Sequence, residues 1–132
     1  MTPQDVYSIF QKAFGQDVWE ESSFMKTITS CDCLANEHGA ILYRTVERET
    51  EILNLAVLPS QMGKGVGTSL VMGMIEDVID ISDKVFLEVA EDNASAIGLY
   101  EKCGFVEIAK REKYYTRVNN DKIDALIMMF QG

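Results

Sequence analysis

Three glycines at alternate positions, Gly63, Gly65 and Gly67, are the first residues whose type and spacing indicate a ligand. They lie between an apolar stretch, residues 53–58, and a long amphipathic segment that begins at Val66. Because glycine has no side chain to keep a ligand away, backbone N–H groups at a helix N-terminus can contact an anion such as phosphate. A flexible turn is the alternative, but three glycines carry an entropic cost that close approach of a ligand would offset.

The loop alone does not identify the anion. A P-loop requires Gly-Lys-Ser or Gly-Lys-Thr, which Gly63-Lys64-Gly65 does not supply. The dinucleotide fingerprint requires its third glycine where Thr68 stands, and an acidic residue at the end of the next strand, where Glu88 stands. The glycine loop therefore leaves a dinucleotide-binding fold open.

Glu88 is the second residue that indicates chemistry, because it is the one charged side chain in an otherwise apolar segment, residues 85–90. A carboxylate in such a strand is costly unless it has a purpose, and a positioned carboxylate can serve as a general base. A glutamate that points to solvent at the end of a strand is the alternative interpretation.

The pattern of apolar residues predicts the elements that position these groups. Helical spacing and start signals predict helices over residues 2–14, 20–29, 66–79 and 93–103. Apolar runs and turn residues predict strands over residues 31–35, 40–46, 51–58, 85–90, 105–109 and 125–130. From residue 50 onward, strands alternate with helices, which predicts an α/β sheet with a right-handed parallel crossover.

Composition narrows the classes of function. The 132 residues, 47% of them apolar, predict a single domain over residues 1–132. The net charge of −9 disfavours nucleic acid and membrane surfaces as partners and favours a cationic substrate such as an amine. Without a signal peptide or a long apolar run, we expect a cytoplasmic protein. The three cysteines are expected to be reduced, and no metal site is expected, because Cys31 and Cys33 lack a second pair of ligands.

The motifs between residues 53 and 105, taken together, resemble those of the GNAT N-acetyltransferase superfamily. They are Leu-Asn-Leu-Ala-Val-x-Pro, Gly65-x-Gly67, Leu87-Glu88-Val89, Asn93-x-x-Ala96 and Leu99-Tyr100-x-x-x-Gly104-Phe105. Within the superfamily, the chain is most similar to the ribosomal-protein-alanine N-acetyltransferases, over about residues 17–130. The resemblance implies a mixed sheet of about six strands with about four helices, and a splayed pair of parallel strands at its centre.

Two features depart from the family pattern. Met62 stands where members usually carry Gln or Arg, with Gln61 one position early, so we expect altered detail of cofactor binding. Members usually begin with a further strand before the first helix, and this chain starts too late to contain a full one. An exposed sheet edge is the expected consequence.

The resemblance implies that an amine attacks the thioester of acetyl-CoA directly. Glu88 would be the general base, directly or through a water, and Tyr100 the general acid for the leaving thiolate, although a tyrosine on an amphipathic helix is usually part of the core. The N–H of Val57 would donate to the oxyanion, and Asn93 would hold the pantetheine arm or cap its helix. The residues implied to bind the cofactor are Leu55, Ala56, Val57, Met62, Gly63, Lys64, Gly65, Val66, Gly67, Thr68, Asn93 and Tyr100.

The acceptor is less defined than the donor. Tyr114 and Tyr115, expected in a loop before the last strand, and Trp19 are assigned to the acceptor, with packing as the alternative for each. The resemblance implies a protein or peptide N-terminus as the partner, with a ribosomal protein as one candidate. The expected assembly is a monomer or homodimer. Acetylation of a polyamine or aminoglycoside, or a non-catalytic acyl-CoA-binding module, are the alternative functions.

Overall fold

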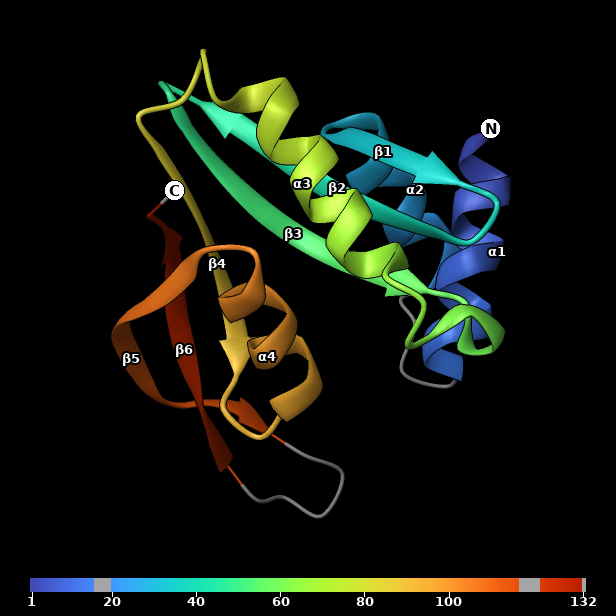
Figure 1. Ribbon diagram of the computed structural model, residues 1–132. Helices are drawn as coiled ribbons and strands as arrows, with labels where there is room; N and C mark the ends of the chain where they lie inside the picture. The colour runs from blue at the N-terminus through green and yellow to red at the C-terminus, as the bar shows by residue number, and fades with distance from the viewer. Residues whose placement is uncertain (16–19, 117–121, 132) are drawn as a thin grey trace.

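The computed structural model describes residues 1–15, 20–116 and 122–131 (Figure 1). The elements follow the order α1 (Pro3–Phe14), α2 (Glu21–Thr29), β1 (Asp32–Asn36), β2 (Gly39–Val46), β3 (Glu49–Val57), the short 3₁₀ turn η2 (Pro59–Gln61), α3 (Val66–Val78), β4 (Lys84–Ala90), α4 (Ala94–Lys102), β5 (Phe105–Thr116) and β6 (Lys122–Phe130). In these described ranges, six strands form one sheet in the order β1-β2-β3-β4-β6-β5. Among the described strands, β3 and β4 are the one pair that runs in parallel, so the expected mixed sheet of about six strands with about four helices is confirmed.

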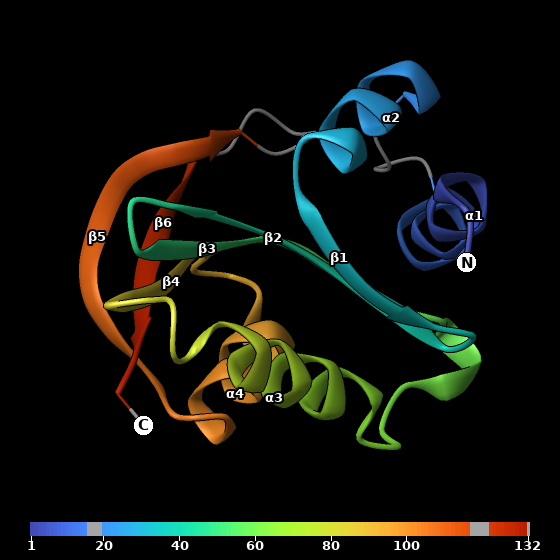
Figure 2. The ribbon, with the colours of Figure 1, turned by 90° about the horizontal axis from the view of Figure 1, so that it is seen from above.

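The helices cover the two faces of the sheet in separate pairs (Figure 2). α1 and α2 pack on the face that carries Ala40, Leu42 and Ala56. α3 and α4 pack on the opposite face, which carries Ile41, Tyr43, Ile52, Val85, Leu87 and Val89. Because successive residues of a strand point to opposite faces, the central strands contribute to both cores, which explains their nearly continuous apolar sequence. No helix in the described part of the chain is long and apolar enough to cross a membrane.

Local signals set the ends of the helices. The Thr2 hydroxyl accepts from the N–H of Asp5 at 3.1 Å, and the Asp5 carboxylate accepts from the N–H of Thr2 at 2.9 Å, which forms a capping box on α1. Asn93 caps α4 by accepting from the N–H of Ala96 at 3.3 Å. Gly104 follows the last turn of α4 with φ of 102°, as the sequence predicts.

β3 contains a bulge. Leu42 of β2 pairs with Asn54, and the next residue, Tyr43, pairs with Ile52, so Leu53 is an extra residue in β3. A bulge bends its strand and increases the local twist. The second half of β3 is therefore directed away from the line of its first half.

β3 and β4 diverge beyond this bulge. Their parallel pairing runs from Glu49 opposite Lys84 to Ile52 opposite Leu87. β3 nevertheless continues to Val57 and β4 to Ala90, and the two strands separate in Figure 1. The splayed parallel pair that the resemblance implied is present.

The hairpin of β5 and β6 is longer than the sequence predicts. Tyr114 and Tyr115, expected in a loop, lie in β5, so that prediction is wrong. The charged residues around Arg111 lie on an edge strand, where side chains can contact solvent. Register shifts between Glu107 and Ala109 and between Arg111 and Tyr115 allow the pairing to continue. Trp19 lies outside the described residues.

Gly39 allows β2 and β3 to approach closely at the start of β2. A Cβ added there would lie 2.6 Å from the backbone oxygen of Ala56.

We expect Gly39→Ala to destabilise the fold by about 1–3 kcal/mol, because the backbone must shift to relieve the contact. Urea denaturation measures the effect. The matched control is Gly98→Ala in α4, where an added Cβ meets nothing within 4 Å and helix propensity predicts a gain of about 0.5–1 kcal/mol. Equal free energies of unfolding for the two variants would mean that the close approach of Gly39 to the backbone oxygen of Ala56 does not restrict the side chain at residue 39.

Candidate active site

A cavity of about 530 Å³ lies between the second half of β3, the glycine loop and α4. It adjoins the region where β3 and β4 separate, with α3 beginning at one side (Figure 1). Nine of the residues predicted to bind a cofactor line it: Leu55, Val57, Met62, Gly63, Gly65, Val66, Gly67, Thr68 and Asn93. The structure therefore brings the strand motif, the loop and the cap of α4 together around one space.

Three of the predicted cofactor residues do not line this cavity. Ala56 is buried on the face covered by α1. Lys64 is exposed in the loop. Tyr100 is buried in the core under α3 and α4.

Other residues of the cavity wall were not identified from the sequence. Ser95, Gly98, Leu99 and Lys102 line it from α4. Their spacing of three and four residues places them on one helical face, so the periodicity that follows Asn93 could have revealed them.

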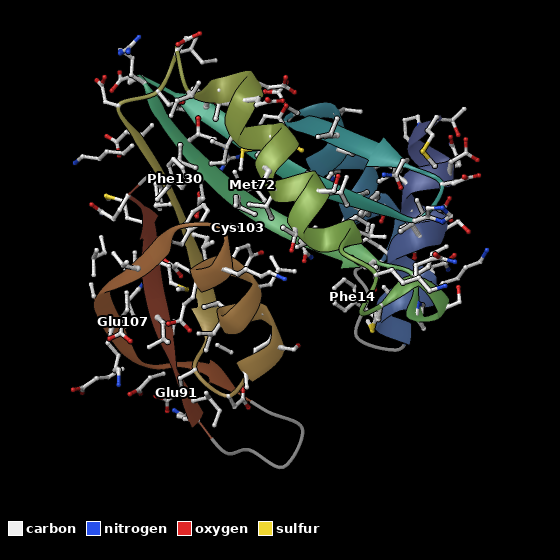
Figure 3. All side chains as sticks on the ribbon, in the orientation of Figure 1. Phe14, Met72, Glu91, Cys103, Glu107 and Phe130 are labelled. Atoms are coloured by element: carbon white, nitrogen blue, oxygen red, sulfur yellow. The ribbon has the colours of Figure 1, made fainter. Side chains whose placement is uncertain are left out.

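The end of α1 also reaches the cavity, through Ala13 and Phe14. Figure 3 shows Phe14 beside the loop that follows β3. Its ring stacks on Phe10 of the same helix, with centroids 5.8 Å apart. No local motif marks these two residues, because only the packing of α1 on the sheet brings them to the site.

The glycines of the loop have two different roles. Gly63 and Gly65 adopt φ of 78° and 82°, which side chains rarely tolerate, and an added Cβ would meet no atom within 4 Å. Gly65 is the N-cap of α3 and supplies no side-chain cap, so N–H groups of the first turn remain available to an anion. Gly67 instead allows α3 to approach α4, since its Cβ would lie 2.5 Å from Leu99 Cδ1. The third glycine is therefore explained by helix packing.

The pairing of β2 with β3 determines which main-chain groups face the gap. The N–H of Leu58 donates to the oxygen of His38 on the β2 side at 2.8 Å. The N–H groups of successive residues in a strand point alternately toward one neighbouring strand and the other. Because that of Leu58 points toward β2, those of Leu55 and Val57 point away from β2. That of Leu55 donates to Asn54 Oδ1 at 2.9 Å. The N–H of Val57 is thus directed at the region between β3 and β4.

Glu88 lies on β4 directly after Leu87, the last residue that pairs with β3. Leu87 and Val89 point into the core under α3 and α4, so Glu88 points to the opposite face. Its side chain is 21% exposed, and its Oε1 accepts from Arg111 Nη1 of β5 at 2.7 Å. A charge-assisted bond of this length holds the carboxylate in one orientation.

Tyr100 lies on the other face of the sheet, with its ring packed edge-on against Phe105 at 5.7 Å between centroids. Burial raises the pKa of Tyr100 far above its usual value, and the charge of Cys103 raises it further. The hydroxyl therefore remains protonated at neutral pH. In the described residues, Tyr100 forms no side-chain hydrogen bond, and no fully buried side-chain oxygen lacks a partner. The hydroxyl is therefore part of the small exposed surface of Tyr100.

Cys103 is a packing residue in this arrangement. It is 6% exposed in the core under α3 and α4. Burial raises the pKa of its thiol, partly offset by the charge of Lys102 and by a hydrogen bond with Thr68. A buried thiol of this kind is a poor nucleophile.

Fold and site together define a class: a mixed α/β sheet whose central parallel strands diverge beside a glycine-rich loop at a helix N-terminus. The sequence pattern of the acetyltransferase (GNAT) family matches residues 5–105. The chain belongs to this family.

The chain is similar to several individual members of this family. The [ribosomal protein bS18]-alanine N-acetyltransferase of Haemophilus influenzae is 35% identical over 94 residues, which cover 68% of this chain and 62% of that protein. The chain thus spans less than two thirds of the length of this curated relative. The crystal structure of the ribosomal-protein-S18-alanine N-acetyltransferase from Escherichia coli superposes with a TM-score of 0.85 at 28% identity, over 97% of this chain and 86% of that one. A Bacillus subtilis acetyltransferase in complex with CoA shares the fold, with a TM-score of 0.78 at 21% identity, over 98% and 93% of the two chains.

Proposed function

We propose that this protein is an acetyl-CoA-dependent N-acetyltransferase that acts on the N-terminal α-amine of a protein, with residues 1–132 as one catalytic domain. The observation that carries the proposal is the cavity beside the gap between β3 and β4, with Glu88 on the far face of the sheet. A donor held on the α3 and α4 side and an amine that arrives from the Glu88 side would meet at this gap.

The donor side fits acetyl-CoA. The diphosphate would bind the N–H groups of the loop at residues 63–68, because Gly63 and Gly65 leave the space in front of them open. The pantetheine arm would follow Leu55 and Val57 of β3 and the cap residue Asn93. The N–H of Val57 is directed so that it could donate to the oxyanion, an interaction typically worth about 3 kcal/mol.

The acceptor side supplies the proton transfers. A free α-amine has a pKa of about 8, so much of it must lose a proton before it attacks. Glu88 accepts that proton, directly or through a water, and the amine then forms a bond to the thioester carbonyl. Tyr100, protonated at neutral pH, returns a proton to the departing thiolate.

The proposed acceptor is the N-terminus of a ribosomal protein that begins with alanine. The proposed location of the reaction is the cytoplasm. The two relatives that support this choice carry that activity in their names. Tyr114, Tyr115 and Trp19 remain candidates for contacts with the acceptor peptide.

A panel of amines tests the proposal. Release of the CoA thiol is followed with acetyl-CoA and short peptides that begin with Ala, Ser, Gly or Met, alongside spermidine and an aminoglycoside. We expect turnover with the peptides and fastest turnover with Ala. Turnover only with the small amines would contradict the acceptor, and acetyl-CoA binding without any turnover would favour a non-catalytic module.

Tyr100→Phe tests the general acid separately from donor binding. The change removes one hydroxyl and keeps the ring contact with Phe105. We expect kcat to fall about 100-fold, the lower end of the usual range for loss of a general acid, while calorimetry finds the acetyl-CoA affinity within about twofold. The matched control is Tyr7→Phe, a tyrosine buried under the opposite face against Phe24. Similar rates for wild type and Tyr100→Phe would overturn the role of Tyr100.

A further inference from the structure

Asn54 is the one polar residue in the second half of β3, residues 53–58 of the sequence. Its Oδ1 accepts a hydrogen bond from the N–H of the next residue, Leu55, at 2.9 Å. In a side-chain amide the oxygen accepts and the nitrogen donates, so this bond identifies the two ends of the group. Nδ2 is therefore the end that the Leu55 N–H leaves unused.

The position of the Asn54 amide follows from that bond. The N–H of Leu55 points away from β2, so the amide bound to it lies on the β4 side of β3, where the two strands separate (Figure 1). Asn54 pairs with Leu42, which packs under α1 and α2, and directly paired residues share a face. The amide is thus at the gap, on the face from which the proposed acceptor arrives.

Asn54 and Glu88 lie on opposite sides of this gap. Ile52 and Leu87 form the last parallel pair; Glu88 is the next residue of β4, and Asn54 is the second residue beyond Ile52 on β3. Both side chains are on the face of the sheet opposite to α3 and α4. An amine that reaches the donor through the gap therefore passes between a carboxylate and an amide.

The Nδ2 group of Asn54 can contact a ligand. Asn54 is partly buried, and Nδ2 has no hydrogen bond to any residue that the structure describes. Among those residues no fully buried side-chain nitrogen lacks a partner, so Nδ2 belongs to the accessible surface. Its N–H groups are neutral donors, which suit a carbonyl oxygen and not an ammonium group.

A peptide α-amine has such an oxygen beside it, because the carbon that bears the amine also bears the first carbonyl group. A polyamine or an aminoglycoside has no carbonyl at that position. We propose that Asn54 Nδ2 donates to the carbonyl oxygen of the first acceptor residue while Glu88 faces the amine. Asn54 thereby selects peptide α-amines over alkyl amines and takes no part in the proton transfers. The proposal rests on the proposed function.

Two substitutions separate this role from support of the Leu55 N–H. Asn54→Asp keeps an oxygen that can accept from that N–H and loses the donor, whereas Asn54→Ala loses both. With a peptide that begins with Ala, we expect both variants to lower kcat/KM about 10-fold, mostly through the KM for the peptide. The KM for acetyl-CoA should not change. Glu49→Gln, at the paired end of β3, is the matched control and should equal the wild type.

Acceptor analogues test the contact with the carbonyl oxygen itself. An alkene isostere of the first peptide bond lacks that oxygen and adds no charge, and a depsipeptide keeps it while losing the N–H of the second residue. We expect the wild type to prefer the peptide over the alkene about 10-fold more than Asn54→Asp and Asn54→Ala do. The depsipeptide should follow the peptide. Comparing ratios between enzymes cancels differences in the intrinsic reactivity of the acceptors.

The possible results distinguish this role from the proposed function. If the ratio of peptide to alkene is the same in the wild type and in both variants, Asn54 does not contact the carbonyl oxygen and only satisfies the Leu55 N–H. That result would leave acetylation of peptides intact. Absence of wild-type turnover with every peptide would instead overturn the proposed function, on which the role of Asn54 depends.

Discussion

Replacing Glu88 with Gln should lower kcat about 10²- to 10⁴-fold, the range typical of a positioned general base. The amide has nearly the shape of the carboxylate and can still accept a hydrogen bond from Arg111, so the fold and acetyl-CoA binding should be preserved. It cannot accept a proton from the amine. The loss should therefore shrink as pH rises above the pKa of the α-amine, about 8, where the attacking form is already neutral.

Glu91→Gln is the matched control for Glu88→Gln. Glu91 directly follows β4 (Figure 3) and also pairs with a cation of β5, Lys110 at 3.7 Å. Lys110 is paired with Leu126, which packs under α3 and α4, so this ion pair lies on the other face of the sheet from Glu88. The rate of Glu91→Gln should therefore equal that of the wild type. Steady-state release of the CoA thiol between pH 6 and 9.5 measures both variants. A loss in Glu88→Gln that stays constant over this range would indicate an orienting role and would refute Glu88 as a base.

Gly67→Val should abolish tight binding of acetyl-CoA. The side chain would enter the contact between α3 and α4, where even a Cβ lies 2.5 Å from Leu99 Cδ1 and 3.6 Å from Val57 Cγ2. Leu99 and Val57 both line the cavity, so relieving the contact must change its shape. Overpacking of this kind costs about 1–3 kcal/mol. If the free energy of binding falls by the same amount, Kd rises about 5- to 150-fold. Calorimetry with acetyl-CoA measures it, with circular dichroism as the check on folding.

A graded series separates shape from general damage. Gly67→Ala should weaken binding less than Gly67→Val, because the contact is with the end of a flexible side chain. Combining Gly67→Ala with Leu99→Ala removes the clashing methyl groups and should restore part of the affinity. Tight binding by Gly67→Val would mean that the donor does not occupy the cavity between β3 and α4.

The elements could be predicted because their signals are local. The apolar spacing of residues 66–79 predicted α3 to within one residue of its observed end, and Asn93 and Gly104 marked the limits of α4. The diverging parallel strands were anticipated only through the resemblance. The bulge at Leu53 that accompanies the divergence follows from pairing with β2 and has no signature in β3 itself.

The hairpin at the C-terminal end shows where local interpretation fails. The sequence predicted a strand over residues 105–109 with Tyr114 and Tyr115 in a loop, yet β5 continues to Thr116. A strand at the edge of a sheet needs only one partner, so β6 and two register shifts were sufficient to extend it. Composition cannot distinguish a charged edge strand from a loop.

The amino-acid sequence by itself determined which groups are available: glycines with open main-chain amides, one acid in an apolar strand and a tyrosine on an amphipathic helix. These are properties of residue type and short spacing, which the chain carries before it folds. Only the tertiary structure decided which groups meet. Arg111 reaches Glu88 across 23 residues of sequence, and Phe14 reaches the cavity through helix packing. Contacts between distant segments depend on how strands pair and diverge, and no local spacing encodes that arrangement.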